Sequence, residues 1–339
     1  MPTDSTHPDY DANADAWLSA RDVFAGEDAV KAANVRYLPK LDSQSADEYN
    51  AYRARASFFN ATARTADGFV GLIFRREPTF KLPENSAGVG RALKAFVDDA
   101  DMLGTSLSAY AKNVVSEVVA VGRAGTLVDW ADSIGGHTWG SATGLPDGQQ
   151  RAYAVMYRAE QILNWATERV NGRNTLTLVT LSEMVPSSVP SGDEFETEMV
   201  EQIRVLKLVN HHMEKPDTAT GWRYEVEIWQ QVEKKSKRGK AEWTKVATRI
   251  PLRLGKPLPL IPFVFHGPRH SLPVVDKLPL ADIIAVNLDH YRLNADYKHG
   301  LHFTALPSCP PPESLPARGV VVRPLVGTEY SLSSWRVRR

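Results

Sequence analysis

Residues 49–83 read YNAYRARASFFNATARTADGFVGLIFRREPTFKLP and carry the clearest structural pattern in the chain. Apolar or small residues recur there at intervals of three and four, which places them on one face of a helix. They are Tyr49, Tyr52, Ala56, Phe59, Ala63, Ala66, Val70 and Ile73. Ser45 and Glu48 fit a capping box just before this stretch. The pattern predicts one helix over about 46–74, followed by an edge strand at Phe80 and Leu82 that ends at Pro83.

Composition limits what kind of protein this is. The 339 residues include 43% hydrophobic ones, enough for one large domain or two ordinary ones. A single cysteine, Cys309, excludes an intrachain disulfide and a cysteine-rich zinc site. The sequence has no apolar run long enough to span a membrane and no apolar signal-peptide stretch near residue 1, so we expect synthesis in a cytosol.

The formal net charge is zero, but the charges are unevenly distributed. Residues 1–200 have a net charge of −9 and residues 201–339 a net charge of +9. Such asymmetry indicates either a polyanionic partner or charge pairing between copies of the chain. A simple difference in composition between the two regions is the alternative.

The remaining elements follow from periodicity and turn residues. We expect an arm over 1–45, with one short helix at about 13–24 and an extended piece at 35–38. A helix pair over 89–121, separated at Gly104 and ending at Gly122, precedes a strand at 126–130. Strands are predicted at 152–157, 174–181, 200–209, 222–232, 242–250 and 261–265, and a last helix at 280–303.

The predicted strands 222–232 and 242–250 form a hairpin with a basic tip. Five of the seven tip residues at 234–240 are cationic: Lys234, Lys235, Lys237, Arg238 and Lys240. These five are the candidate contacts for a polyanion or a protein partner. The alternative is a solvated hairpin tip, in which lysines discourage edge-to-edge strand pairing.

An ordered series of short motifs runs through most of residues 7–307. It includes Tyr52-x-x-Arg55-Ala56-x-Phe58-x-Asn60, Val70-Gly71-x-Ile73-Phe74-Arg75-x-x-Pro78, Gly122-Arg123, Ile162-x-Asn164-Trp165, and Asn287-x-x-His290-Tyr291-Arg292-x-Asn294-Ala295-Asp296. In this order the motifs resemble a family of tailed-bacteriophage portal proteins that was formerly catalogued as a domain of unknown function.

The resemblance implies an α+β portal fold with an α/β wing, a strand-rich clip region and long stem helices. Residues 1–45 would be an N-terminal arm, 46–155 the wing, 156–274 the strand-rich region with the clip, and 275–306 a stem and channel helix. The polar positions of that helix are the channel candidates: Asn287, His290, Arg292, Asn294, Asp296 and Lys298. Residues 307–339 form an atypical tail, so the crown and the last wing segment are expected to be missing.

The same resemblance implies a function through assembly. Portal subunits form a ring, usually of twelve copies, at one vertex of the virion capsid, and are made in the cytoplasm of the bacterial host. The ring is the channel for double-stranded DNA and the docking site for the terminase packaging motor, the head-tail adaptor and the capsid proteins. It contacts DNA without sequence specificity and contacts no membrane.

Two alternatives belong to other classes of protein. A metal-dependent hydrolase could use His290, His299 and His302, although the His-Glu-x-x-His spacing is absent. The sequence also lacks a Gly-x-Ser-x-Gly elbow and a phosphate-binding glycine loop, so we expect no enzyme, no cofactor and no metal. The other alternative is a non-functional, truncated prophage remnant, because the family pattern is lost after about residue 312.

Overall fold

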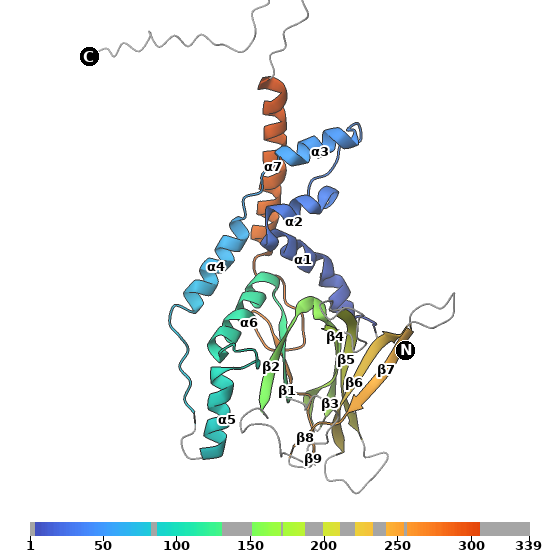
Figure 1. Ribbon diagram of the computed structural model, residues 1–339. Helices are drawn as coiled ribbons and strands as arrows, with labels where there is room; N and C mark the ends of the chain where they lie inside the picture. Colours follow the sequence, from blue (N-terminus) through green and yellow to red (C-terminus); the bar gives the residue numbers. More distant parts are fainter. Residues whose placement is uncertain are drawn as a thin grey trace, which may run out of the picture.

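The computed structural model describes residues 4–82, 87–130, 151–170, 172–186, 199–210, 221–232, 242–253 and 256–305. These residues form a helical part that stands on a body of antiparallel sheets (Figure 1). The fold is therefore of the mixed α+β class, as predicted.

The helices belong mainly to the first and last thirds of the described chain. They are α1 (Pro8–Ala25), α2 (Glu27–Ala32), α3 (Ala46–Arg55), α4 (Ala61–Ile73), α5 (Ala87–Asp98), α6 (Leu107–Val121) and α7 (Ala281–Ala305), with short 3-10 turns η1 (Asn34–Arg36) and η2 (Ala159–Gln161). The predicted pair over 89–121 is confirmed as α5 and α6, and Gly122 ends α6 in the left-handed region at φ +79°. The predicted last helix is confirmed as α7.

The strands form two main antiparallel sheets and one small ribbon. They are β1 (Ala124–Trp130), β2 (Ala152–Arg158), β3 (Ile162–Val170), β4 (Arg173–Pro186), β5 (Met199–Asn210), β6 (Trp222–Val232), β7 (Glu242–Arg249), β8 (Leu252–Arg253), β9 (Lys256–Pro257) and β10 (Phe263–His266). One sheet has the order β3-β4-β5-β6-β7, the other β10-β1-β2, and β8 pairs with β9. All six strands predicted after residue 150 are present, and β3, β8 and β9 are additional ones.

The two main sheets share one apolar core. Leu127, Tyr157, Phe263 and Phe265 of the smaller sheet pack with Ile162, Trp165, Val179, Leu181, Leu206, Leu208, Tyr224 and Val226 of the larger one. The predicted domain boundary at 155/156 falls inside β2, and β10 pairs with β1 across it. Residues assigned to the wing and residues assigned to the strand-rich region are therefore joined through hydrogen-bonded strands and a common core.

The N-terminal residues are more highly structured than the expected arm with one short helix. The helix expected at 13–24 is confirmed as part of the longer α1, but the expectation of a single short helix is wrong, because α2 and η1 follow it. α1 and α2 bury Trp17, Val23 and Val30 completely. The extended piece expected at 35–38 is also wrong, since η1 occupies part of it and Leu38 is buried behind it. These helices pack with α3 and α7 in a second core.

The single helix predicted over 46–74 is wrong, because it is two helices separated at residues 56–60. The capping box at its start is confirmed: the Ser45 side chain accepts from Glu48 N at 3.2 Å. The interruption changes which side chains point inward. Phe58 is 6% exposed and Phe59 53% exposed, the reverse of the continuous-helix pattern. The predicted strand at 80–82 is wrong as well, since residues 77–82 have no regular structure.

Candidate functional site: the two sides of helix α7

The tip of the hairpin at 234–240, which we call the basic loop, carries the first group of candidates. All five lie outside the described residues: Lys234, Lys235, Lys237, Arg238 and Lys240. The hairpin that carries them is confirmed, because β6 pairs with β7 in antiparallel register from Val226↔Arg249 to Val232↔Glu242. The contact role of the loop stays a prediction.

Helix α7 carries the second group of candidates, and side chains on its inner side bind the backbone of the interruption between α3 and α4. The Asn287 side-chain oxygen accepts from Thr62 N at 3.1 Å and from Thr62 Oγ1 at 3.0 Å, while its Nδ2 donates to Phe59 O at 2.9 Å. Asn294 accepts from Ser57 N at 3.0 Å. Two asparagines of α7 therefore satisfy backbone groups that the interruption leaves without a helical partner.

Three further candidates of α7 bind the same N-terminal elements. Arg292 Nε donates to Tyr37 O at 2.8 Å, and Lys298 Nζ donates to the Ser57 hydroxyl. Asp296 accepts from the Tyr52 hydroxyl at 2.5 Å, and burial together with this carboxylate raises the pKa of Tyr52. The structure thus brings five of the six predicted residues into contacts within the chain. The sixth, His290, is exposed, and no hydrogen bond or ion pair joins it to another of the described residues.

The three histidines of the hydrolase alternative do not converge. His290 and His299 are about 13 Å apart along the axis of an α-helix. His299 Nδ1 lies 3.0 Å from Arg55 Nη2 and its ring packs on Tyr52, whereas His302 packs on Phe303. Among the described residues, no group of three or more His, Cys, Asp or Glu side chains is arranged to hold a metal ion.

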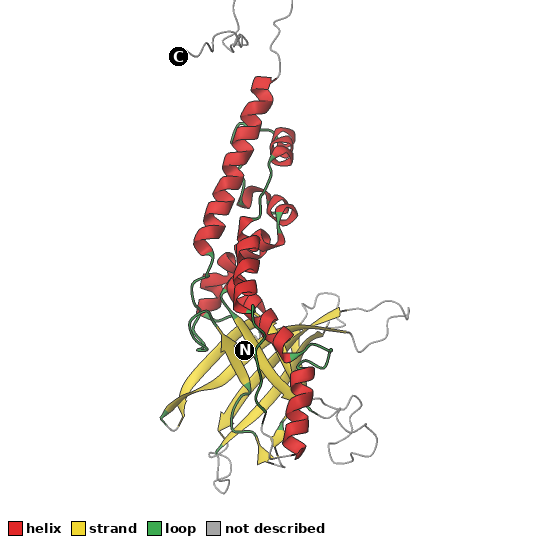
Figure 2. Ribbon diagram, turned by 90° about the vertical axis from the view of Figure 1, so that its left-hand side faces the viewer, coloured by secondary structure: helices red, strands yellow, loops and turns green. Residues whose placement is uncertain are grey.

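The outer side of α7 is an apolar surface that the sequence analysis missed. Val286, Leu293, Tyr297 and Leu301 are between 47% and 70% exposed, and their spacing of seven, four and four places them on one side. We call these four residues the α7 free face. The spacing of this helix predicts an apolar stripe of Leu280, Ile284, Leu288, Tyr291, Ala295 and His302. The first five are confirmed as the buried side, whereas the inclusion of His302 is wrong, because its side chain is exposed near the end of α7. Figure 2 shows α7 along one edge of the helical part, with the short helices on its other side.

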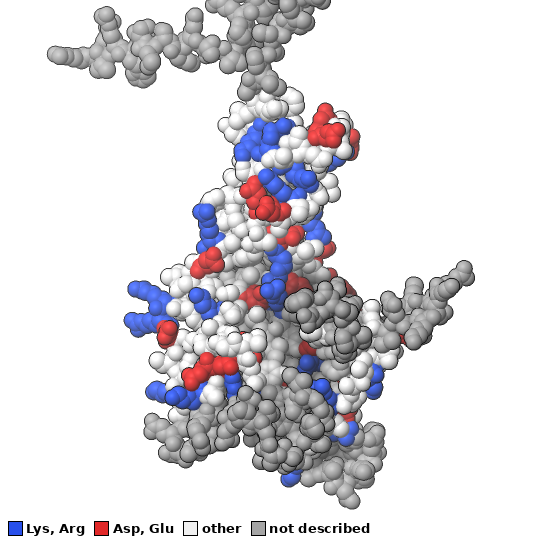
Figure 3. All heavy atoms as spheres, in the orientation of Figure 1, with Lys and Arg blue, Asp and Glu red and all other residues white. Residues whose placement is uncertain are grey.

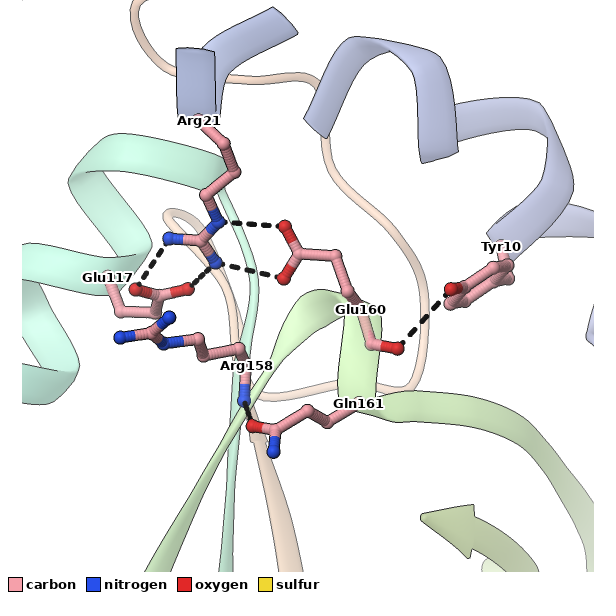
Figure 4. Close-up of polar contacts among 6 residues, drawn as sticks. All are labelled: Tyr10, Arg21, Glu117, Arg158, Glu160 and Gln161. Carbon is pink, nitrogen blue, oxygen red and sulfur yellow. Dashed lines mark hydrogen bonds and ion pairs between the residues drawn. The ribbon is translucent and has the colours of Figure 1, made fainter. Parts of the chain in front are cut away.

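A charged cluster connects the helical part to the sheets (Figure 4). Arg21 of α1 binds both oxygens of Glu160 on η2, at 2.8 and 2.9 Å, and both oxygens of Glu117 on α6. Burial is the largest single influence on the pKa of Glu160 and would raise it. The hydrogen bonds to Arg21 and to the backbone, together with the charges of Arg21 and Arg158, outweigh burial and hold the pKa below the usual value. Because each charged group is paired within the cluster, the arrangement is suited to joining α1, α6 and η2 rather than to catalysis.

Arg123 is a buried cation of a different kind. Its guanidinium carbon lies 4.1 Å from the centre of the Trp165 ring and 4.6 Å from that of Phe265. Burial lowers its pKa to about 10. The N-terminal segment closes over this region, since His7 N donates to Leu163 O at 2.9 Å and the His7 ring stacks on Trp165. The cation is enclosed and does not present an open binding site.

A depression of about 350 Å³ lies between α2 and α3. It is lined by Asp28, Lys31, Ala32, Asn50, Arg53 and Ala54. Its lining has no Ser, Cys or His that could serve as a nucleophile or proton carrier. The α7 free face is therefore the feature of the described residues that most needs an explanation in terms of function.

Comparison with known proteins adds no family. No model of a known protein family matches the sequence, and no curated protein matches it. In the described part of the chain, no helix combines the length and the apolar character needed to cross a membrane.

Proposed function

We propose that this chain is a structural portal subunit, which forms a closed ring of about twelve copies at one vertex of a phage capsid. The ring would be the channel for double-stranded DNA during packaging and ejection. It would also be the docking site for the terminase motor and for the head-tail adaptor and capsid proteins. The ordered motifs of the sequence support this proposal.

The α7 free face is the single observation in the structure that most favours assembly. Val286, Leu293 and Tyr297 leave more than half of each side chain exposed on a helix whose opposite side is packed. A contiguous apolar surface on a soluble protein usually marks an interface. Since α7 lies along one edge of the helical part (Figure 2), this face is accessible to a neighbouring copy.

The direct test is the mass of the purified full chain by light scattering, together with negative-stain images of the same sample. The proposal predicts particles of roughly twelve times the 37.6 kDa chain with a central hole. A monomer at all concentrations would contradict it, and would favour the alternative of a non-functional remnant. Stoichiometric zinc together with chelator-sensitive hydrolysis would favour the metal enzyme.

Variants identify the surface that drives assembly. Leu293→Glu and Tyr297→Glu place a charge on the α7 free face and should reduce the assembled fraction while the urea midpoint of the chain stays unchanged. Leu103→Glu is the matched control, because Leu103 is exposed but lies between α5 and α6. Equal losses in all three variants would refute a specific role for α7.

We also propose that the basic loop contacts DNA or a partner protein. A channel requires neutralisation of phosphates rather than recognition of bases, and binding of this kind weakens as salt increases. Replacing Lys234, Lys235, Lys237, Arg238 and Lys240 by glutamine should weaken binding to duplexes of any sequence and flatten its salt dependence. Unchanged binding with unchanged salt dependence would refute DNA contact by the loop.

A further inference from the structure

Helix α4 carries a second exposed apolar surface at its end. Phe69, Leu72 and Ile73 are between 46% and 69% exposed, although Ala66 and Val70 beside them are buried. Two exposed cations, Arg75 and Arg76, come directly after Phe74. We call these five residues the α4 basic end. Figure 1 shows α4 diverging from α7, and Figure 3 shows blue atoms projecting at its lower end.

The α7 free face complements the α4 basic end in charge. Asp282, Asp289 and Asp296 are exposed along one edge of the α7 free face. The cations of α7 itself point elsewhere, because Arg292 and Lys298 bind Tyr37 and Ser57 on the inner side. Among the described residues, no ion pair involves Asp289, Arg75 or Arg76. Asp282 pairs with Lys277 and Asp296 accepts from Tyr52, so Asp289 is the charge of the α7 edge without a partner among the described residues, opposite in sign to Arg75 and Arg76.

The two surfaces of one chain cannot meet each other. α4 is attached to α7 through its start, where Thr62 binds Asn287 on the inner side of α7. Asn287 follows Val286 directly, so the α7 free face lies about 100° around the helix from this attachment. The end of α4 diverges from α7 (Figure 1). Pairing therefore requires two chains. Antiparallel pairing of two α7 free faces would bring the aspartate edges together, where like charges repel.

We propose that the α7 free face of one copy binds the α4 basic end of the next copy. The contact joins two different surfaces, so it is heterologous and can propagate around a ring. Apolar contact between Leu293 or Tyr297 and Leu72 or Ile73 would provide the adhesion, and Asp289 opposite Arg75 and Arg76 would select the orientation. This inference rests on the proposed ring and names the pair of surfaces that builds it.

Crosslinking between two differently marked chains tests the pairing. In a Cys309→Ser background, chains carrying Tyr297→Cys are assembled with chains carrying Leu72→Cys and treated with a short thiol-to-thiol crosslinker. The inference predicts 297–72 products and few 297–297 products. Each chain has one thiol, so every product joins two copies. Mainly 297–297 products, or no crosslinks in a sample that still assembles, would overturn the pairing and leave the proposed ring standing.

Charge exchange is the second arm of the test. Asp289→Arg and Arg76→Asp should each raise the concentration needed for assembly about tenfold, equivalent to about 1.4 kcal/mol. Combining both in one chain should restore assembly, because the opposite charges face each other again. Arg64→Asp is the matched control, since Arg64 is exposed on α4 beside Phe59 and outside the α4 basic end. Failure of the combined variant to recover would contradict the pairing.

Thiol labelling of the unassembled chain distinguishes this inference from two alternatives: a chain that covers its own α7 free face, and a chain that never assembles. Tyr297→Cys in a Cys309→Ser, Asp289→Arg background, kept below its assembly concentration, should react with a maleimide as fast as an exposed thiol. Slow labelling would show that the chain covers its own α7 free face and would overturn the docking inference. A wild-type chain that is monomeric at every concentration would refute both the ring and the pairing.

Discussion

Replacing Asn287 with alanine should destabilise the helical part more than the same replacement of Asn294, the other asparagine of α7 that binds the interruption. The substitution removes three hydrogen bonds, two from Thr62 and one to Phe59 O, in a place where the asparagine itself is buried. A hydrogen bond stabilises the folded state by about 1 kcal/mol net, and the substitution removes three. Because it also leaves buried polar groups without partners, the free energy of unfolding should fall by about 3–4 kcal/mol.

Asn294→Ala is the matched comparison, because Asn294 lies two turns further along α7 and makes a single bond to Ser57 N. Its loss should be about 1 kcal/mol. Both variants are compared with the wild-type chain by urea unfolding at one fixed protein concentration. Hydrogen exchange at the Thr62 amide provides a local readout, since this amide donates to Asn287 and should exchange faster only in Asn287→Ala.

Equal losses in the two variants would refute the reasoning, because they would show that the number of bonds does not decide the cost. A loss under about 1 kcal/mol in Asn287→Ala would refute it as well, by showing that water replaces the asparagine without penalty. In either case the interruption between α3 and α4 would have to be maintained by packing of Phe58 and its neighbours instead.

Three further predictions concern the core. Arg21→Leu should cost about 3 kcal/mol of unfolding free energy by leaving a buried carboxylate unpaired, whereas Arg36→Leu should cost under about 1 kcal/mol because its partner is exposed. The pKa of Glu160 is lowered in the folded chain, so this carboxylate stabilises the fold fully above the ordinary glutamate pKa, and the stabilisation is lost as the pH falls. Urea midpoints measured from pH 7 to 3 should therefore fall less steeply in Arg21→Leu than in the wild-type chain. Gly125→Ala should cost about 1–3 kcal/mol in the same assay, because a Cβ there would overlap the Phe263 ring; a neutral result would show that the sheet can relax.

The strands could be predicted where one face of each is buried. In β6, Trp222, Tyr224, Val226 and Ile228 alternate with polar residues, and the register shift between Ile228 and Trp229 in the pairing with β7 falls where the alternation changes. β3 was missed because its buried residues, Ile162 and Trp165, lie in its first half, and Glu168 and Arg169 give its end the composition of a loop. Local alternation predicts a strand only when the burial is continuous along it.

The interruption at residues 56–60 could not be predicted from the local pattern. The spacing of three and four continues through it, and Ser57 and Asn60 alone do not require a helix to stop. What stabilises the interruption is Asn287 and Asn294, more than 220 residues further along the chain. Contacts this distant in sequence override local propensity, and no window of sequence contains them.

The candidate site was predicted in part. The buried stripe of α7 was identified from its spacing, but the α7 free face was not, because a helix with apolar residues on both sides has no clear amphipathic pattern. The polar candidates of α7 were chosen for a channel, and the contacts of five of them within the chain became visible only with the tertiary structure. Their place relative to a channel stays a prediction.

The dependence of the α3–α4 interruption on α7 has a consequence for synthesis on the ribosome. The backbone groups of Ser57, Phe59 and Thr62 emerge early, but their partners Asn287 and Asn294 are translated more than 220 residues later. Contacts between residues this far apart in the sequence are slow to form. Until they form, the N-terminal elements expose apolar surface. The nascent helices α1–α4 should therefore need protection by a chaperone until α7 has been translated, and arrest of translation before residue 281 should leave them sensitive to protease.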